Sequence, residues 1–296
     1  MSRNELQAMI NLLDDSDQEI YALVSKSIFD KGVDVVPDLE KAWEMSTNTV
    51  IQDKLEDIIH QIQLNFIQQS LLNWIRSGAD DILEGAYIIA RYQYPELNLY
   101  EIFNEVKKIV GHAYADINDN LTATEKVNVI NRIIYDTNKF TSNTSNYYSP
   151  QNSYINQVIY SKKGSPISLG IIYIAVAYRL GVPVYGVNLP KNFILGYKDN
   201  FYNILNTDTN QTNILFYINP FNRGAILGRR EIDNFLKQQN IKMNEMFYDT
   251  CSNLEIIQRL ILNLIYSYEK LGYSSKVKHL QDLLKLSKTS FDHSDI

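Results

Sequence analysis

Few side chains in this sequence can act as nucleophiles or general bases near neutral pH. Its 296 residues include a single cysteine, Cys251, and four histidines, His60, His112, His279 and His293. One cysteine excludes an internal disulfide and any zinc site built from several cysteines. Histidine is the side chain whose ordinary pKa lies near neutrality, and here the four are scattered along the chain. We therefore expect little general-base chemistry and no metal site.

The most informative motif is the segment Gly164-Ser165-Pro166-Ile167-Ser168-Leu169. Ser165 suits the N-cap of a helix and the proline suits its first position, so a helix is predicted from here to Gly181. A serine at such a place acts as a nucleophile only when a base lies within reach. Because residues 152–230 contain neither histidine nor cysteine, we interpret Ser168 as part of the helix cap.

The residues after this helix predict a small antiparallel sheet. Strand-like runs occupy residues 184–189, 192–197 and 214–218, with a polar stretch over 206–213 before the third run and a short helix over 231–238 after it. A capped helix followed by such a sheet is an α+β unit. The chain as a whole is predicted to be α+β and mostly helical.

Helices are also expected on both sides of this unit. Apolar residues at helical spacing predict them over residues 50–64, 65–75, 80–92, 100–110 and 122–134. A further helix is expected from Asn152, which we interpret as its N-cap, to the stop at Lys162-Lys163-Gly164. A long polar loop over residues 141–150 precedes it, and loops of this length in compact proteins are either mobile or functional.

Together these motifs resemble the bacterial transglutaminase-like regulator family of the SirB type. That family starts a helix with Gly-x-Pro-x-Ser-Leu, follows it with a Pro-x-His-Phe strand turn and then with an Asp-Pro-Phe turn. The corresponding segments here are residues 164–169, Pro190-Lys191-Asn192-Phe193 and Asn219-Pro220-Phe221. Upstream, residues 83–95 resemble the family's helical lead-in and residues 152–156 its Asn-Ser-x-x-Asn element, so the likeness covers roughly residues 80–250.

The resemblance implies a papain-like core whose catalytic relatives use a Cys at the helix start, a His on the next strand and an Asp on the strand after. It places the Cys position at Pro166, or at Ser168 if the register shifts, the His position at Asn192 and the Asp position at Asn219. Proline carries no nucleophile and asparagine is no general base. We therefore expect a vestigial site in a pseudoenzyme, with Asn192 and Asn219 able to keep a hydrogen bond across it.

Two alternative functions stay open. A divergent peptidase, amidase or acyltransferase could use Ser168, with His60 or His112 arriving from the helical region as its base. A DNA-associated regulator is suggested only by the regulatory role of the family, and the net charge of −6 argues against it. We expect Cys251, well beyond the predicted sheet, to be a partly buried and unreactive thiol.

Both ends of the chain are predicted to be helical interaction segments. Residues 1–78 carry short helices separated by an acidic turn and resemble HEAT-type repeats, with an irregular helical bundle as the alternative. Residues 251–290 hold two amphipathic helices broken at Gly272 and resemble one TPR hairpin, which must pack on another surface, most simply the central domain. Residues 79–250 then form the transglutaminase-like domain and residues 291–296 a frayed tail.

Composition agrees with a protein-interaction or regulatory scaffold in the cytoplasm. Hydrophobic residues make up 45% and charged residues 21%, as in ordinary globular proteins. The N-terminus lacks a secretory pattern and no run of about 18 apolar residues occurs, so no membrane contact is expected. We also expect no cofactor and no nucleic acid, and a protein or peptide as the partner.

Basic residues lie on the predicted loops around the central motif. They are Lys162, Lys163, Lys191, Arg223, Arg229 and Arg230. We interpret them, and Lys162, Lys163, Lys191 and Arg223 above all, as the rim of a cleft that binds an acidic peptide or partner. The alternative is a solvated surface without a ligand.

Overall fold

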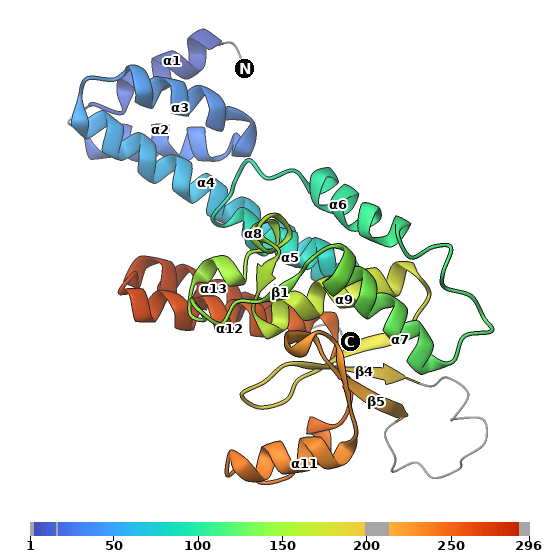
Figure 1. The fold of residues 1–296 in the computed structure, drawn as a ribbon. Coiled ribbons are helices and arrows are strands. Elements are labelled where there is room, and N and C mark those ends of the chain that lie inside the picture. The colour runs from blue at the N-terminus through green and yellow to red at the C-terminus, as the bar shows by residue number, and fades with distance from the viewer. Residues whose placement is uncertain (1–2, 16, 199–212, 290–296) are drawn as a thin grey trace. The chain divides into compact units, whose positions relative to one another are not determined.

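The computed structural model describes residues 3–15, 17–198 and 213–289 (Figure 1). The chain divides into two compact units, Met1–Leu71 and Leu72–Ile296, and each is described by itself. Most of the polar stretch predicted over 206–213 and the tail predicted over 291–296 lie outside the described residues. No helix of the described part is long and apolar enough to cross a membrane.

The N-terminal unit is built from short helices around an aliphatic core. Its elements are α1 (Arg3–Leu12), α2 (Gln18–Phe29), the 3-10 helix η1 (Gly32–Val35), α3 (Val36–Met45) and the first part of α4 (Thr49–Arg76). Leu13, Ile28, Leu39 and Leu55 are fully buried in this core. The likeness to HEAT repeats stays a prediction.

The helix α4 is longer than the sequence pattern indicated. Two helices were expected, over residues 50–64 and 65–75, whereas one helix runs from Thr49 to Arg76. No glycine or proline lies within it, and the polar residues around position 65 can all continue a helix. The change in composition near that position is therefore not a boundary.

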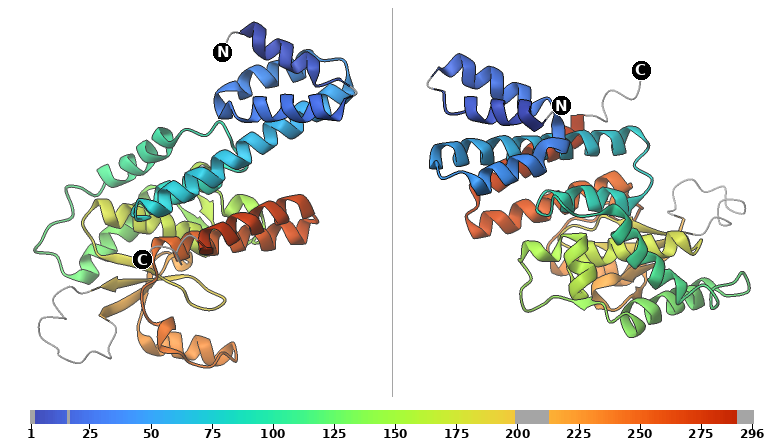
Figure 2. Two further views of the ribbon diagram at one scale, coloured as in Figure 1. Left: turned by 180° about the vertical axis from the view of Figure 1, so that it is seen from behind. Right: turned by 90° about the horizontal axis from the view of Figure 1, so that it is seen from above.

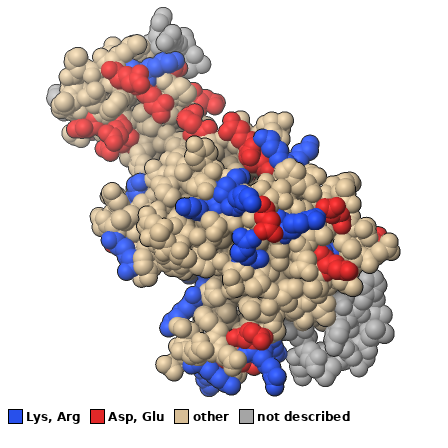
Figure 3. Space-filling view, in the orientation of Figure 1, with Lys and Arg blue, Asp and Glu red and all other residues tan. Residues whose placement is uncertain are grey.

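The N-terminal unit has an excess of acidic over basic residues, and several of them are visible on the face shown in Figure 3. Residues 1–71 carry 13 Asp and Glu against 5 Lys and Arg, a net charge of −8, which leaves +2 for residues 72–296. The overall charge of −6 therefore conceals a slightly basic second unit.

The second unit is organised around a buried helix, α9 (Pro166–Arg179). Every residue of α9 from Pro166 to Ala177 is buried, as expected for a helix that is apolar on all sides. The predicted N-cap at Ser165 is confirmed. The helices that pack around α9 are α5 (Ile82–Arg91), α6 (Leu99–Gly111), α7 (Ala123–Asn131), α8 (Ile155–Ser161) and α12 (Asn253–Leu271).

The predicted antiparallel sheet is confirmed and gains a strand. Its order is β3 (Val184–Val187), β4 (Ile194–Lys198), β5 (Ile214–Asn219) and β6 (Ala225–Leu227). Side chains alternate between its faces, so Leu195 lies against α9 whereas Ile194 joins the cluster of α11 (Arg229–Gln238). Figure 1 shows the sheet between these two helices. A separate two-residue parallel pair joins β1 (Thr141–Ser142) to β2 (Lys163–Gly164).

The two C-terminal helices form a hairpin that packs on the central elements. α12 and α13 (Ser274–Thr289) lie side by side (Figure 2), and Gly272 between them adopts a left-handed φ of +77°. α12 contacts both α5 and α9, as expected of a hairpin that must cover another surface. Its likeness to a TPR unit stays a prediction.

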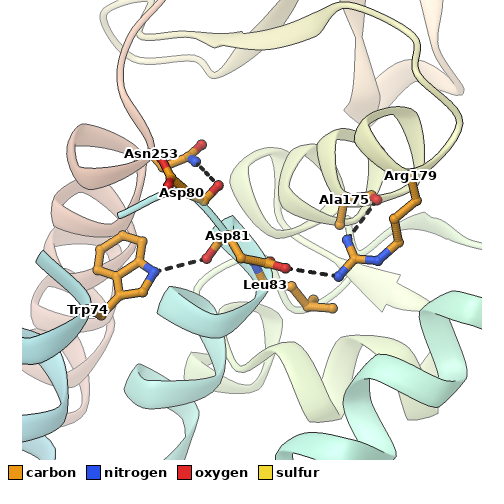
Figure 4. A network of polar contacts seen from close by, with 7 residues as sticks. All are labelled: Trp74, Asp80, Asp81, Leu83, Ala175, Arg179 and Asn253. Carbon is orange, nitrogen blue, oxygen red and sulfur yellow. Dashed lines mark hydrogen bonds and ion pairs between the residues drawn. The ribbon is translucent and has the colours of Figure 1, made fainter. Parts of the chain in front are cut away.

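A polar network around Asp81 joins the elements that position α9 and α12 (Figure 4). The Asp81 carboxylate pairs with Arg179 of α9 at 3.1 Å, and its carbonyl accepts a hydrogen bond from Trp74 at 3.0 Å. Asn253, the first residue of α12, donates to the neighbouring carbonyl of Asp80 at 2.8 Å. The turn at Asp80 and Asp81, just before α5, therefore fixes both the end of α9 and the start of α12.

Two predicted helix boundaries were wrong. An α-helix was expected over 122–134, whereas α7 ends at Asn131 and is followed directly by a π-helix, η2 (Arg132–Thr137). Asn152 is not an N-cap, because it belongs to the 3-10 helix η3 (Pro150–Asn152), and α8 starts only at Ile155. The Asn152 side chain bonds instead to the preceding loop.

Two glycines leave the room that the buried ring of Phe193 occupies. A Cβ added to Gly170 of α9 would lie 2.5 Å from Phe193 Cε1, and one added to Gly186 of β3 would lie 2.9 Å from its Cζ. We expect Gly170→Ala to lower the free energy of unfolding by about 1–3 kcal/mol, since the ring must move within a packed core. Chemical denaturation measures this change.

Gly111→Ala is the matched control, because a Cβ at this helical glycine meets nothing within 4 Å. We expect equal or slightly higher stability for this control. A Gly170→Ala protein as stable as the control would contradict the described packing of Phe193.

Candidate functional site

A pocket of about 470 Å³ lies at the N-terminus of α9, within the second unit. Four segments far apart in the sequence form its walls. They are the loop over residues 147–153, the start of α9, the turn between β3 and β4, and one face of α12. The start of α9 and the β3–β4 turn also carry Pro166 and Asn192, two of the positions that the family resemblance assigns to catalytic residues.

The start of α9 is held by a reciprocal pair of serines. Ser168 Oγ accepts a hydrogen bond from the Ser165 N–H at 2.9 Å and donates to the Asn152 carbonyl at 2.6 Å. Ser168 is completely buried and is not among the lining residues of the pocket, whereas Ser165 and Pro166 are. The Ser168 hydroxyl therefore has the predicted role in the helix cap.

The turn between β3 and β4 brings the predicted His position to the same pocket. Lys191, Asn192 and Phe193 all line it, and Asn192 Oδ1 accepts the Phe193 N–H at 2.9 Å. Lys191 adopts a left-handed φ of +61°. The structure thus places Asn192 and Pro166, at the predicted His and Cys positions, in the lining of one cavity.

The predicted Asp position lies outside this lining. Asn219 Oδ1 accepts the N–H groups of Phe221 at 3.0 Å and Asn222 at 3.2 Å, which caps the 3-10 helix η4 (Pro220–Asn222). Within the described part of the chain, no hydrogen bond joins Asn219 to Asn192. Asn219 therefore shapes a turn, and two of the three predicted positions share the pocket.

The loop wall is fixed by the buried amide of Asn152. Its Nδ2 donates to the carbonyls of Asn146 at 2.7 Å and Tyr147 at 3.0 Å, and its Oδ1 accepts from Asn143 at 2.7 Å. Its own carbonyl accepts the bond from Ser168. The loop and the start of α9 are therefore joined through one residue.

Aromatic rings extend this wall across the pocket. The ring of Tyr147 makes edge contacts with those of Phe221 and Tyr148, at centroid distances of 6.0 and 5.2 Å. The ring of Tyr148 in turn contacts that of Tyr266 on α12, with 5.6 Å between their centroids. Lys270 lies over the rings of Tyr148 and Tyr266, 4.8 and 5.0 Å from their centroids. The polar loop of the sequence thus becomes a tyrosine-rich wall with a cation at its rim.

The face of α12 carries residues that the sequence reading missed. Arg259, Asn263 and Tyr266 line the pocket at the spacing i, i+4, i+7, which puts them on one side of the helix. Arg259 Nη1 donates to the Leu189 carbonyl at 2.8 Å and to Asn188 Oδ1. The sequence signal that could have identified them is their spacing along one side of an amphipathic helix.

None of the described histidines lines the pocket, and neither does the cysteine. His279 contacts Tyr92 and His112 contacts Asn138, away from the pocket lining, and His293 lies outside the described residues. Cys251 is half-buried, and burial raises the pKa of its thiol to about 12. Among the described residues, no group of three or more His, Cys, Asp and Glu could hold a metal ion.

Of the basic residues expected around a cleft, Lys191 lies in the pocket wall. Lys162 Nζ lies 4.6 Å from the centroid of the Phe140 ring, and Arg223 pairs with Asp136. Arg229 forms a two-pronged pair with Glu245 at 2.6 and 2.7 Å. Lys162, Lys163 and Arg223 are not among the residues that line the pocket.

Comparison with known proteins gives a family match over most of this unit. Residues 100–262 match the family model described as the transglutaminase-like superfamily. A UPF0162 protein of Xylella fastidiosa is 36% identical over 116 residues, which cover 38% of this chain and 41% of that protein. No solved structure matches the chain.

Two further relatives come from different kingdoms. The UPF0162 protein YchA of Escherichia coli is 27% identical over 164 residues, 54% of this chain and 56% of YchA. The mouse F-box only protein 21 is 29% identical over 167 residues, 55% of this chain and 25% of that protein. The matched part therefore spans less than two thirds of each of these relatives.

The role of Asn152 can be tested by an almost isosteric change. We expect Asn152→Asp to lower the free energy of unfolding by about 3 kcal/mol, because the carbonyls of Asn146 and Tyr147 lose their donor and face a carboxylate. Asn146→Asp is the control, since it makes the same change on an exposed side chain of the same loop. Equal stability of the two variants, measured by denaturation, would show that Asn152 does not hold the loop.

The raised pKa of Cys251 predicts slow reaction with thiol reagents. The thiolate is the reactive form, so at pH 8 we expect the folded protein to react with iodoacetamide at least about tenfold more slowly than the unfolded protein. The rate in the folded protein should still be rising at pH 10, whereas that of an ordinary thiol levels off above pH 9. Fast labelling at pH 8 that levels off near pH 9 would contradict the buried, protonated thiol.

Proposed function

The chain belongs to the transglutaminase-like superfamily, and from this premise we propose that its pocket binds a protein or peptide partner without catalysis. The observation that carries the proposal is the composition of the pocket wall. Pro166 and Asn192 stand where the resemblance places the nucleophile and the base, and the described lining contains no Cys, His, Asp or Glu. A pocket without these groups cannot activate a nucleophile in the manner of the family.

The hydroxyl groups at the site support the same proposal. Ser168 is buried and donates to a backbone carbonyl, so its oxygen does not face a ligand. Ser165 Oγ accepts the Ser168 N–H as the helix cap, at 3.4 Å. Neither serine has an imidazole or a carboxylate beside it among the lining residues. Both therefore fit a structural role.

The remaining lining residues suit the recognition of a peptide. Tyr147, Tyr148 and Tyr266 offer flat apolar faces with polar ends, and such side chains dominate binding surfaces between proteins. The side-chain amides of Asn192 and Asn263 can donate to and accept from peptide groups. We propose that this set of groups binds a short segment of another protein.

The flanking helices complete the proposed scaffold. We propose that residues 1–78 act as a HEAT-like segment and residues 251–290 as a TPR-like hairpin, both available for protein contacts. The single cysteine agrees with a cytoplasmic location, which is part of the same proposal. We propose that this scaffold has a regulatory role, as the resemblance to the SirB-type regulators implies.

A peptide-binding experiment with a blocked pocket tests the proposal. A random peptide library is panned on the full chain, and the affinities of the enriched peptides are measured by fluorescence polarisation. We expect Asn263→Trp, which fills the pocket, to weaken binding at least about tenfold, or 1.4 kcal/mol. Leu262→Trp is the control, because Leu262 precedes Asn263 on α12, is half exposed and does not line the pocket.

Mass spectrometry of the same mixtures tests the absence of catalysis. The peptides should keep their mass after long incubation, and a fluorophosphonate probe should not label Ser168. Cleavage or acyl transfer that Ser168→Ala abolishes would establish the divergent hydrolase instead. Unchanged binding by Asn263→Trp would show that the peptides do not bind in this pocket.

A further inference from the structure

Arg259 is a partly buried cation whose partners are neutral. Its Nη1 donates to the Leu189 carbonyl at 2.8 Å and to Asn188 Oδ1, and none of the ion pairs among the described residues includes it. Burial also lowers the pKa of Arg259, although a guanidinium stays charged at any physiological pH. A charge removed from water without a counter-ion is unfavourable, so a bound anion would stabilise it.

The guanidinium is already oriented for such an anion. The two bonds of Nη1 fix the plane of the group against the β3–β4 turn. Its Nη2 and Nε have no hydrogen-bond partner in the described part of the chain, and Arg259 lines the pocket. These two nitrogens form the edge that holds a carboxylate through two parallel bonds.

The charged residues that line the pocket have a single sign of charge. Lys191 is a second cation in the wall, and Lys270 stands over two of the lining tyrosines. No Asp or Glu occurs among the described lining residues. A cavity lined by one sign of charge concentrates ligands of the opposite sign.

From this arrangement we propose that the pocket recognises a carboxylate of the bound peptide, with Arg259 as the residue that pairs with it and Lys191 beside it. The carboxylate belongs to an acidic side chain or to the C-terminus of the peptide. This inference rests on the proposed peptide binding and adds the chemical identity of what is bound. The basic residue of the proposed binding site is then Arg259 on α12, in place of Lys162, Lys163 and Arg223 on the loops.

Peptide pools that differ only in charge provide the test. The probes are acetylated hexapeptide pools with Glu or Gln fixed at each position in turn, each made with a free or an amidated C-terminus. We expect the wild-type chain to bind at least one carboxylate-bearing pool about tenfold more tightly than its neutral counterpart. Raising the salt concentration should reduce this preference.

Variants of Arg259 and a matched lysine identify the binding residue. Arg259→Gln should remove the preference, and Arg259→Lys should keep only part of it, since lysine carries the charge without the fork. Lys163→Gln, an equal loss of charge at an exposed position outside the lining, should leave it unchanged. Thermal melts of each variant show whether it is folded. Lys191→Gln tests the site without changing α12, and it should reduce the preference by half or more.

The outcomes separate this inference from the proposed function. Equal binding of charged and neutral pools by the wild type would overturn the carboxylate, while peptide binding would stand. Binding of no pool at all would overturn both. A preference that survives Arg259→Gln in a folded protein would overturn the role of Arg259, and tighter binding of a pool with fixed phosphoserine would replace the carboxylate by a phosphate.

Discussion

The site depends on one buried amide, that of Asn152. A polar side chain with only 3% of its surface exposed must satisfy its hydrogen bonds within the protein, and Asn152 does so entirely with the loop that precedes it. Its carbonyl meanwhile receives the Ser168 hydroxyl from the start of α9. The tyrosine wall and the helix start therefore keep a fixed separation, and this separation defines the pocket.

The remainder of the second unit holds α9 and α12 at the distances that this pocket requires. The carboxylate of Asp81 holds the far end of α9, and Asn253 fixes the start of α12 to the same turn. Phe193 fills the space between Gly170 and Gly186 and forms part of the pocket wall. Proline is favoured at the first position of a helix, so Pro166, where the resemblance places the nucleophile, suits the start of α9.

Local sequence signals predicted the parts of this structure that local physics decides. The cap at Ser165, the helix behind it and three strands of the sheet follow from neighbouring residues alone. Asn152 was mistaken for a helix cap because asparagine suits both roles, and only the folded loop shows which carbonyls it meets. β6 was missed because its three residues gain strand character only by pairing with β5.

The candidate site was predictable only in part for the same reason. Pro166 and Asn192 could be placed by motif, since each lies in a short segment with recognisable turn residues. Arg259 could not be placed in this way, because its hydrogen-bond partners Asn188 and Leu189 lie about 70 residues away in the chain. The overall charge of −6 also averages two different units, since the second unit has a net charge of +2.

The left-handed backbone of Lys191 sets stability against ligand recognition at one position. A side chain with a Cβ is disfavoured at a φ of +61°, where glycine is free of strain and asparagine is tolerated. A screen for heat resistance would therefore be drawn to Gly or Asn at this turn, and each such gain in melting temperature would remove a positive charge from the cavity. The most thermostable form of this protein and its best-binding form are thus expected to be different sequences.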